Sequence, residues 1–69
     1  MKLVYSDHAK KRMRQRGITS LEIELVLAHP EYVKKTFEGR KEAFAFVKNR
    51  VIRIVFIEVE NYIRVITVL

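Results

Sequence analysis

The spacing of hydrophobic and polar positions along the chain changes near residue 30. Before it, apolar residues recur with helical spacing, whereas after it they alternate as they do in β-strands. Pro30 lies at the change, and proline disfavours helical geometry at the residue that precedes it. The chain therefore predicts an N-terminal helical part followed by a sheet.

The first helix is expected to run to about residue 16. Ser6 or Asp7 can cap its first turn, and Gly17 tolerates the left-handed conformation that commonly ends a helix. Before it, residues 2–5 have the composition of a short edge strand.

The second helix is expected over residues 20–28. Thr19 and Glu22 have the spacing of a capping box, which fixes its start. Only Glu22 and Glu24 are clearly polar within it, so most of its circumference is expected to be covered.

Four strands joined by short turns are expected in the remainder of the chain. Loops this short favour antiparallel hairpins. The strands are expected at residues 32–37, 43–47, 51–59 and 62–69, with turns at 38–41, 49–50 and 60–61. The predicted fold is a single α+β domain, residues 1–69, in the order β-α-α-β-β-β-β. Two helices would lie on one face of a four-stranded antiparallel meander.

The last two strands are apolar on both faces. Simple alternation in the final strand places one set of side chains opposite the other: Ile63, Val65, Thr67 and Leu69 against Tyr62, Arg64, Ile66 and Val68. Two short helices cover only one face of a sheet, so the second apolar face needs another cover. A homodimer or a protein partner would supply it.

Positive charge is concentrated at the N-terminal end. The formal net charge is +6, and residues 1–17 carry six Lys and Arg against one Asp, which gives +5. A basic segment on a nearly neutral body is typical of an electrostatic footprint for nucleic acid. General solubility is the competing explanation.

Composition excludes several other classes. The chain has no cysteine, so it has no disulfide framework and no thiolate zinc site, which fits a cytoplasmic location. Its longest apolar runs are far too short to span a membrane. Only two histidines are present, on different expected elements, and no glycine-rich phosphate loop occurs, so neither a metal nor another cofactor is expected. The abundance of Glu, Lys, Arg and Ile over Gln and Asn hints at a thermophilic source.

The first helix carries the strongest candidate for chemistry. His8, Arg12 and Arg16 fall within about 80° of each other on a helical wheel, at the border of the buried stripe. An imidazole beside two forked guanidinium groups suits phosphate binding and proton transfer. The competing interpretation is that the arginine stems pack on the core and their head groups pair with Glu. The flanking cations Lys10, Lys11 and Arg14 would add to an RNA-binding surface.

Polar residues among apolar neighbours mark the last hairpin. They are Arg53, Tyr62, Arg64 and Thr67. Arginine within a strand of Val and Ile is costly unless it binds an anion or reaches water, although protection of a sheet edge is an equal explanation. Tyr62 could stack on a base, or it could simply pack.

The run from His8 to Ile18 resembles the signature H-A-x-x-R-M-x-x-R-G-I of a family of small prokaryotic domains. Its members close near an I-T-V segment, which Ile66, Thr67 and Val68 match here. The resemblance implies a fold similar to that of the RelE-like and barnase-like toxin ribonucleases, and it marks His8, Arg12, Arg16 and Thr67 as the site.

We therefore expect a metal-independent endoribonuclease of the toxin type, acting on free or ribosome-associated RNA and restrained by an antitoxin protein. Its catalytic residues would be His8, Arg12, Arg16, Arg64 and Thr67. RNA would be held by Lys10, Lys11, Arg12, Arg14, Arg16, Arg53 and Tyr62. Two alternatives stay open, a non-catalytic RNA-binding or translation-associated module and a dimeric structural domain.

Overall fold

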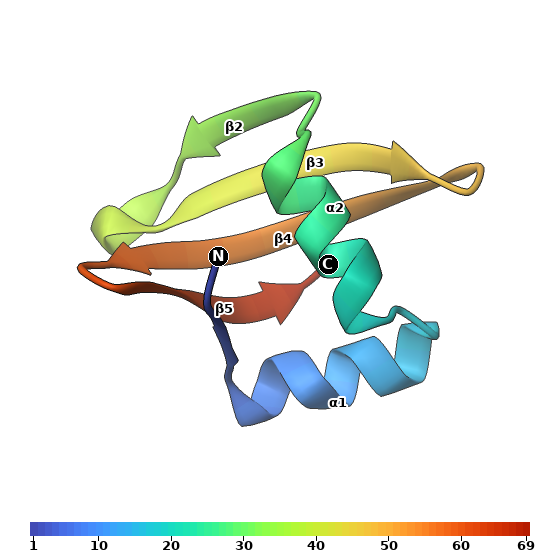
Figure 1. The fold of residues 1–69 in the computed structure, drawn as a ribbon, viewed down its shortest axis with the longest axis horizontal. Helices are drawn as coiled ribbons and strands as arrows, with labels where there is room; N and C mark the ends of the chain where they lie inside the picture. Colours follow the sequence, from blue (N-terminus) through green and yellow to red (C-terminus); the bar gives the residue numbers. More distant parts are fainter.

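A computed structural model describes the whole chain, residues 1–69, and has the α+β class that the sequence predicts. Two helices precede most of the sheet (Figure 1). The elements are β1 (Leu3–Tyr5), α1 (Asp7–Arg16), α2 (Ser20–Ala28), β2 (Tyr32–Lys35), a 3₁₀ turn (Phe37–Gly39), β3 (Lys41–Val47), β4 (Arg50–Val59) and β5 (Tyr62–Val68).

The sheet has five strands in the order β1-β5-β4-β3-β2, not four. β2 to β5 form the expected antiparallel meander, and β1 pairs with β5 in parallel, with Leu3 opposite Ile63 and Tyr5 opposite Val65. The N-terminal residues thus become the fifth, edge strand of a mixed sheet. β1 covers only the first part of β5, so the end of β5 has a free edge.

Local signals place both helices where the sequence predicts them. The Ser6 hydroxyl accepts a hydrogen bond from the backbone N–H of Ala9, and Gly17 ends α1 with φ of 64°. Thr19 and Glu22 form the complete capping box at the start of α2. Both helix starts are therefore fixed by side chains within three residues of the cap.

The two helices occupy different places against the sheet. α2 packs on β3 and β4 and covers the middle of one face, while α1 packs on β5 and β1 along the edge (Figure 1). The Ser6 hydroxyl also donates to the carbonyl of Ile66 at 2.6 Å, which joins the start of α1 to the free edge of β5. Helix α1 therefore takes the place that a longer β1 would have occupied.

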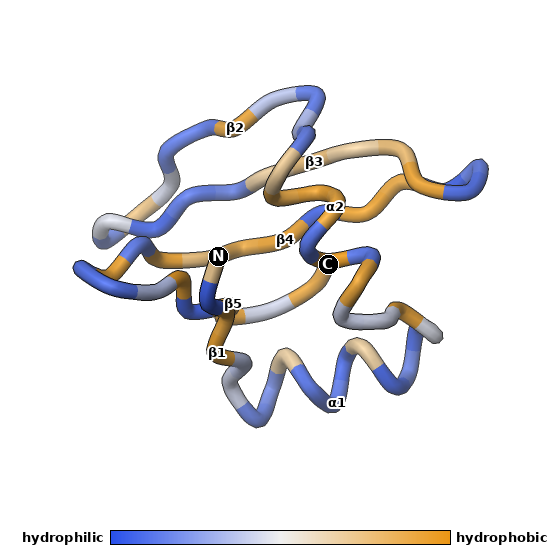
Figure 2. Tube along the Cα trace, viewed as in Figure 1, coloured by the Kyte–Doolittle hydropathy of each residue, from blue (hydrophilic) through white to orange (hydrophobic).

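One face of the sheet builds the core. The central strands are strongly hydrophobic, whereas α1 is largely hydrophilic (Figure 2). The buried cluster draws on both helices and on three strands, and comprises Ala9, Ile18, Ile23, Val26, Ala43, Ala45, Ile52, Ile54, Phe56, Val65 and Val68. The opposite face has no helix on it, and we call it the open face. The exposed Val51 and Val59 of β4 lie there, as the two-sided pattern predicts.

The prediction that α2 would be covered around most of its circumference is wrong. Leu21 and Leu25 are exposed, whereas Glu22 is only 5% exposed. Because α2 meets the sheet along one side only, Ile23 and Val26 are fully buried and the leucines on the far side remain in solvent.

Two turns differ from the predicted ones. β2 ends at Lys35, and a short 3₁₀ turn replaces the end of the predicted strand. The β3–β4 hairpin turns at Lys48 and Asn49, which both have positive φ, so Arg50 begins β4 instead of lying in the turn. A two-residue loop with positive φ at both positions matches the twist of the paired strands. Neither helix has the length or the apolar composition needed to span a membrane.

Candidate nucleic-acid interface

Arg12 is anchored at the free end of β5. Its Nε donates a hydrogen bond to the carbonyl of Val68 at 3.1 Å, and the hydroxyl of Thr67 lies 3.5 Å from the same oxygen. The remaining guanidinium N–H groups of Arg12 donate to no protein atom. The backbone thus positions Arg12 beside Thr67 and leaves its forked end free for an anion.

A β-bulge changes the faces of β5. Val55 and Phe56 are adjacent on β4, yet they pair with Thr67 and Val65, so Ile66 is an extra residue. Simple alternation had placed Thr67 and Arg64 on opposite faces, and that prediction is wrong. Thr67 pairs with Val55 and Arg64 with Ile57, which puts both side chains on the open face. The two strand residues expected in the site therefore share one face.

The flank of α1 that carries His8 and Arg12 is turned toward the same side. On the helical wheel these residues lie to one side of the buried Ala9, and Met13 lies to the other. Met13 faces the start of α2, because it lines a hollow there together with Thr19. Since α2 covers the core face, the His8 and Arg12 flank borders the open face at the edge of β5.

His8 and Arg16 are both exposed on α1. His8 lies in the first turn and makes no side-chain hydrogen bond. Arg16 lies in the last turn, where its carbonyl, not its guanidinium, is engaged by Arg50. The structure brings Arg12 and Thr67 to one carbonyl. His8 and Arg16 lie about one turn of α1 before and after Arg12, and Arg64 lies three residues before Thr67 on β5.

No carboxylate neutralises these cations. The ion pairs of the protein are Lys34 with Glu42, Lys41 with Glu58, and Arg50 with Glu22. The alternative that the head groups of Arg12 and Arg16 pair with Glu is therefore wrong. Its other part holds for Arg12, which is half-buried, so that its stem does pack. All the predicted RNA-binding cations are left available: Lys10, Lys11, Arg12, Arg14, Arg16 and Arg53.

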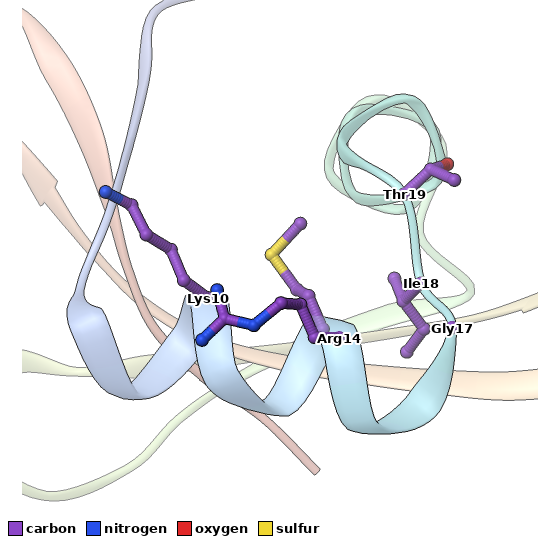
Figure 3. A pocket seen from close by; sticks show the side chains of 6 residues that line it. Lys10, Arg14, Gly17, Ile18 and Thr19 are labelled. Atoms are coloured by element: carbon purple, nitrogen blue, oxygen red, sulfur yellow. The ribbon is translucent and has the colours of Figure 1, made fainter.

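The opposite flank of α1 carries a second cationic surface. Lys10 and Arg14 border an open hollow of about 430 Å³ between α1 and the start of α2, with Met13, Gly17, Ile18 and Thr19 as its other lining residues (Figure 3). Lys11 is exposed on the outer side of the helix. α1 thus presents positive charge on both flanks.

Arg53 and Tyr62 lie on the open face, away from α1. Arg53 is exposed on β4, and its guanidinium carbon lies 5.7 Å from the centre of the Phe44 ring, within range of a cation–π interaction. Tyr62 is half-buried at the start of β5, opposite Val59. The predicted residues therefore form two groups, one along α1 and the end of β5 and one across the sheet.

Arg50 is an important residue that sequence reasoning treated only as part of a turn. Its guanidinium donates to the carbonyls of Arg16 and Gly17, each at 2.8 Å, and contacts the buried carboxylate of Glu22 at 3.3 Å. It thus ties β4 to the end of α1 and to the start of α2. A positive charge at a helix C-terminus also interacts favourably with the partial negative charge of the helix dipole there.

The pKa of Glu22 is lowered from its ordinary value. The hydrogen bond from the backbone N–H of Thr19 is the largest cause, and the Thr19 hydroxyl and the positive charge of Arg50 add to it, while burial acts in the opposite direction. Glu22 therefore remains a carboxylate in the folded protein at neutral pH. It serves the junction of the two helices and is not available as a catalytic acid.

The comparisons with known proteins identify the family of this small α+β domain with a basic helix. The family described as a domain of unknown function, DUF4258, matches residues 5–69, so the chain belongs to it. The match includes α1 and the end of β5, where the candidate site lies. No curated protein and no solved structure matches the chain.

Proposed function

We propose that this protein is a toxin-like, metal-independent endoribonuclease. The observation that carries the proposal is the pair formed by Arg12 and Thr67 at the carbonyl of Val68, with the guanidinium fork of Arg12 unopposed by any carboxylate. An arginine anchored through Nε with its fork free is prepared for a phosphate.

The proposed reaction uses the 2′-hydroxyl of RNA as the nucleophile. The 2′ oxygen forms a bond to the adjacent phosphorus, the bond from phosphorus to the 5′ oxygen breaks, and the products are a 2′,3′-cyclic phosphate and a 5′-hydroxyl. His8 either accepts the 2′-hydroxyl proton or supplies the proton of the leaving oxygen, and water performs the other transfer. Arg12 and Arg16 offset the charge that builds on the phosphate, and Arg64 and Thr67 complete the site from β5.

The proposal places the protein in the cytoplasm, where RNA substrates occur. A chain without cysteine has no disulfide bond that the reducing conditions there could break. A ribonuclease with an exposed basic site needs restraint in its own cell. We therefore propose that an antitoxin protein binds over the site. The proposed substrate is mRNA, free or associated with the ribosome.

The test is cleavage of an end-labelled RNA in the presence of a metal chelator. His8→Ala should lower the cleavage rate by about 10²- to 10⁴-fold, since it removes the proton-transfer group. His29→Ala is the matched control, because His29 is the other exposed histidine and lies at the end of α2. Equal rates for the parent protein and His8→Ala would remove His8 from the mechanism, and absence of any cleavage by the parent protein would contradict the proposal.

A specific observation favours the second candidate, a non-catalytic RNA-binding module. The imidazole of His8 has no hydrogen-bond partner to orient it, whereas catalytic histidines are usually oriented by one. The binding module uses the same cations and predicts tight, salt-sensitive RNA binding without cleavage. The same assay, read for binding and for products, separates the two functions.

A further inference from the structure

The open face carries a continuous aromatic cluster that the proposed reaction does not use. The rings of Tyr32 and Phe44 are stacked with centroids 4.8 Å apart, and Phe46 meets Phe44 edge to face at 5.2 Å. Phe46 is 63% exposed and Tyr32 is also exposed. Contiguous exposed apolar side chains mark interaction sites, whereas isolated ones such as Phe37 are common at protein surfaces, so this cluster is a candidate binding surface.

Positive charge accompanies the aromatic rings. Arg53 lies over the ring of Phe44, and Arg64 lies on the same face of the next strand. The register places Lys34 and Glu42 opposite each other on this face, and they contact at 3.9 Å. The face therefore carries three cations against one carboxylate, and that carboxylate already has a cation beside it.

We infer that the cluster of Tyr32, Phe44, Phe46 and Arg53 is a stacking platform for unpaired bases of single-stranded RNA. Aromatic rings interleaved with cations are the combination by which proteins hold single strands, because each base has a π face and each nucleotide carries a phosphate. We call these four residues the base platform. Its substrate class is single-stranded RNA with little sequence preference, since stacking does not read base edges.

Charge decides between RNA and a second copy of this chain as the occupant. In a symmetric dimer the open face would meet itself, and Arg53 and Arg64 would be taken from water opposite a face whose only carboxylate is Glu42. The apolar residues of β4 would gain from such contact, but the central cations would lose their solvent without a counter-charge. A polyanion supplies that charge along its whole length.

The base platform lies next to the proposed reaction site. Phe44 pairs with Arg53 on β4, and Val55, the next residue of β4 on the same face, pairs with Thr67 on β5. The step from β3 to β5 is two strand spacings, about 10 Å. A strand whose phosphate reaches Arg12 and Thr67 can therefore continue directly onto the aromatic rings. Only this path of the RNA strand, from the reaction site to the aromatic rings, rests on the proposed function.

The experiment measures binding without cleavage. The probe is a short, fluorescently labelled 2′-O-methyl oligouridine, which lacks the free hydroxyl that the reaction needs. Phe46→Ala and Tyr32→Ala should each weaken binding by about 5- to 150-fold, the range for loss of one stacked base. The dependence of log affinity on log salt should keep the parent slope, because no phosphate contact is removed. Phe37→Ala is the matched control, since Phe37 is 84% exposed but lies outside the cluster, in the 3₁₀ turn.

Three results would overturn the base platform. The first is unchanged affinity in both platform variants, and the second is an equal loss in Phe37→Ala. The third is a parent dimer in sedimentation that Phe46→Ala converts to monomer while the RNA affinity stays the same, which would assign the face to a second copy. Failure of the proposed function gives a different result: the parent protein would not cleave ordinary RNA, but it would still bind the methylated probe through the base platform.

Discussion

Arg50 offers the sharpest test of how the fold holds the basic helix in place. We predict that Arg50→Ala destabilises the protein although the residue lies at the surface end of β4. The substitution removes two hydrogen bonds to the C-terminal carbonyls of α1 and the cation beside Glu22. No other side-chain hydrogen bond links β4 to the end of α1 and the start of α2.

The size of the effect follows from these contacts. Hydrogen bonds from a charged donor contribute about 1.5–3 kcal/mol where water is excluded, but the side chain of Arg50 is 41% exposed. We therefore assign about 1 kcal/mol to each of its two carbonyl bonds, or about 2 kcal/mol together. For a domain of this size that loss lowers Tm by roughly 10 °C. The uncompensated, buried carboxylate of Glu22 acts in the same direction.

Thermal unfolding followed by circular dichroism at neutral pH measures the effect. Arg50→Lys should give an intermediate loss, because an ammonium group cannot span two carbonyls and a carboxylate as the planar guanidinium does. Arg64→Ala is the control, an exposed arginine of the neighbouring strand without an ion pair. If Arg50→Ala lowers Tm no more than Arg64→Ala does, the junction does not depend on Arg50 and the reasoning fails.

Three further predictions concern α1 and its junction with α2. Arg12→Ala and Arg16→Ala should each reduce the slope of log RNA affinity against log salt by about one phosphate contact without unfolding the protein. Arg12→Ala also removes the hydrogen bond to the Val68 carbonyl and should lose about 1 kcal/mol of stability, whereas Arg16→Ala should leave Tm nearly unchanged. Loss of folding in either variant would support a packing role instead. The pKa of Glu22 is lower in the folded protein than in the unfolded chain. Its ionised carboxylate therefore contributes its full stabilisation above the pKa of the unfolded state, and this stabilisation is lost as pH falls through the pKa of the folded state. The Tm difference between the parent protein and Glu22→Gln should therefore be largest near neutral pH and shrink in acid, and a difference that is constant with pH would contradict the assignment. Gly17→Ala should cost about 1 kcal/mol from the left-handed backbone alone, since no atom lies within 4 Å of the added methyl group, and Gly17→Asn should cost less in the same unfolding assay.

Signals that act over a few residues were readable from the sequence. The Ser6 cap, the Gly17 stop and the capping box of Thr19 and Glu22 each involve groups within about three residues, so spacing alone located both helices. The alternation in β4 likewise predicted which side chains are buried and which lie on the open face. The basic stripe of α1 was visible for the same reason, because a helix converts sequence spacing directly into a face.

The arrangement of the candidate site was decided by contacts between distant parts of the chain. β1 joins β5 across some sixty residues, which leaves the end of β5 free for α1 and lets Arg12 reach the Val68 carbonyl. The bulge at Ile66 moved Thr67 to the face of Arg64, and no local pattern marks it, since Ile66 is an ordinary strand residue.

Glu22 and Arg50, the two charged residues of the helix junction, show the same difference between local signals and long-range contacts. Glu22 was recognised as a capping residue, but its burial depends on the approach of β4. Arg50 has no local signal at all, because the two carbonyls that it binds are more than thirty positions earlier in the chain. The sequence by itself determined the helices, the strands and the basic face of α1, because neighbouring residues specify them. Only the tertiary structure decided which cations are held, which are free for an anion and which face they share, because those properties depend on pairings between residues far apart in the chain.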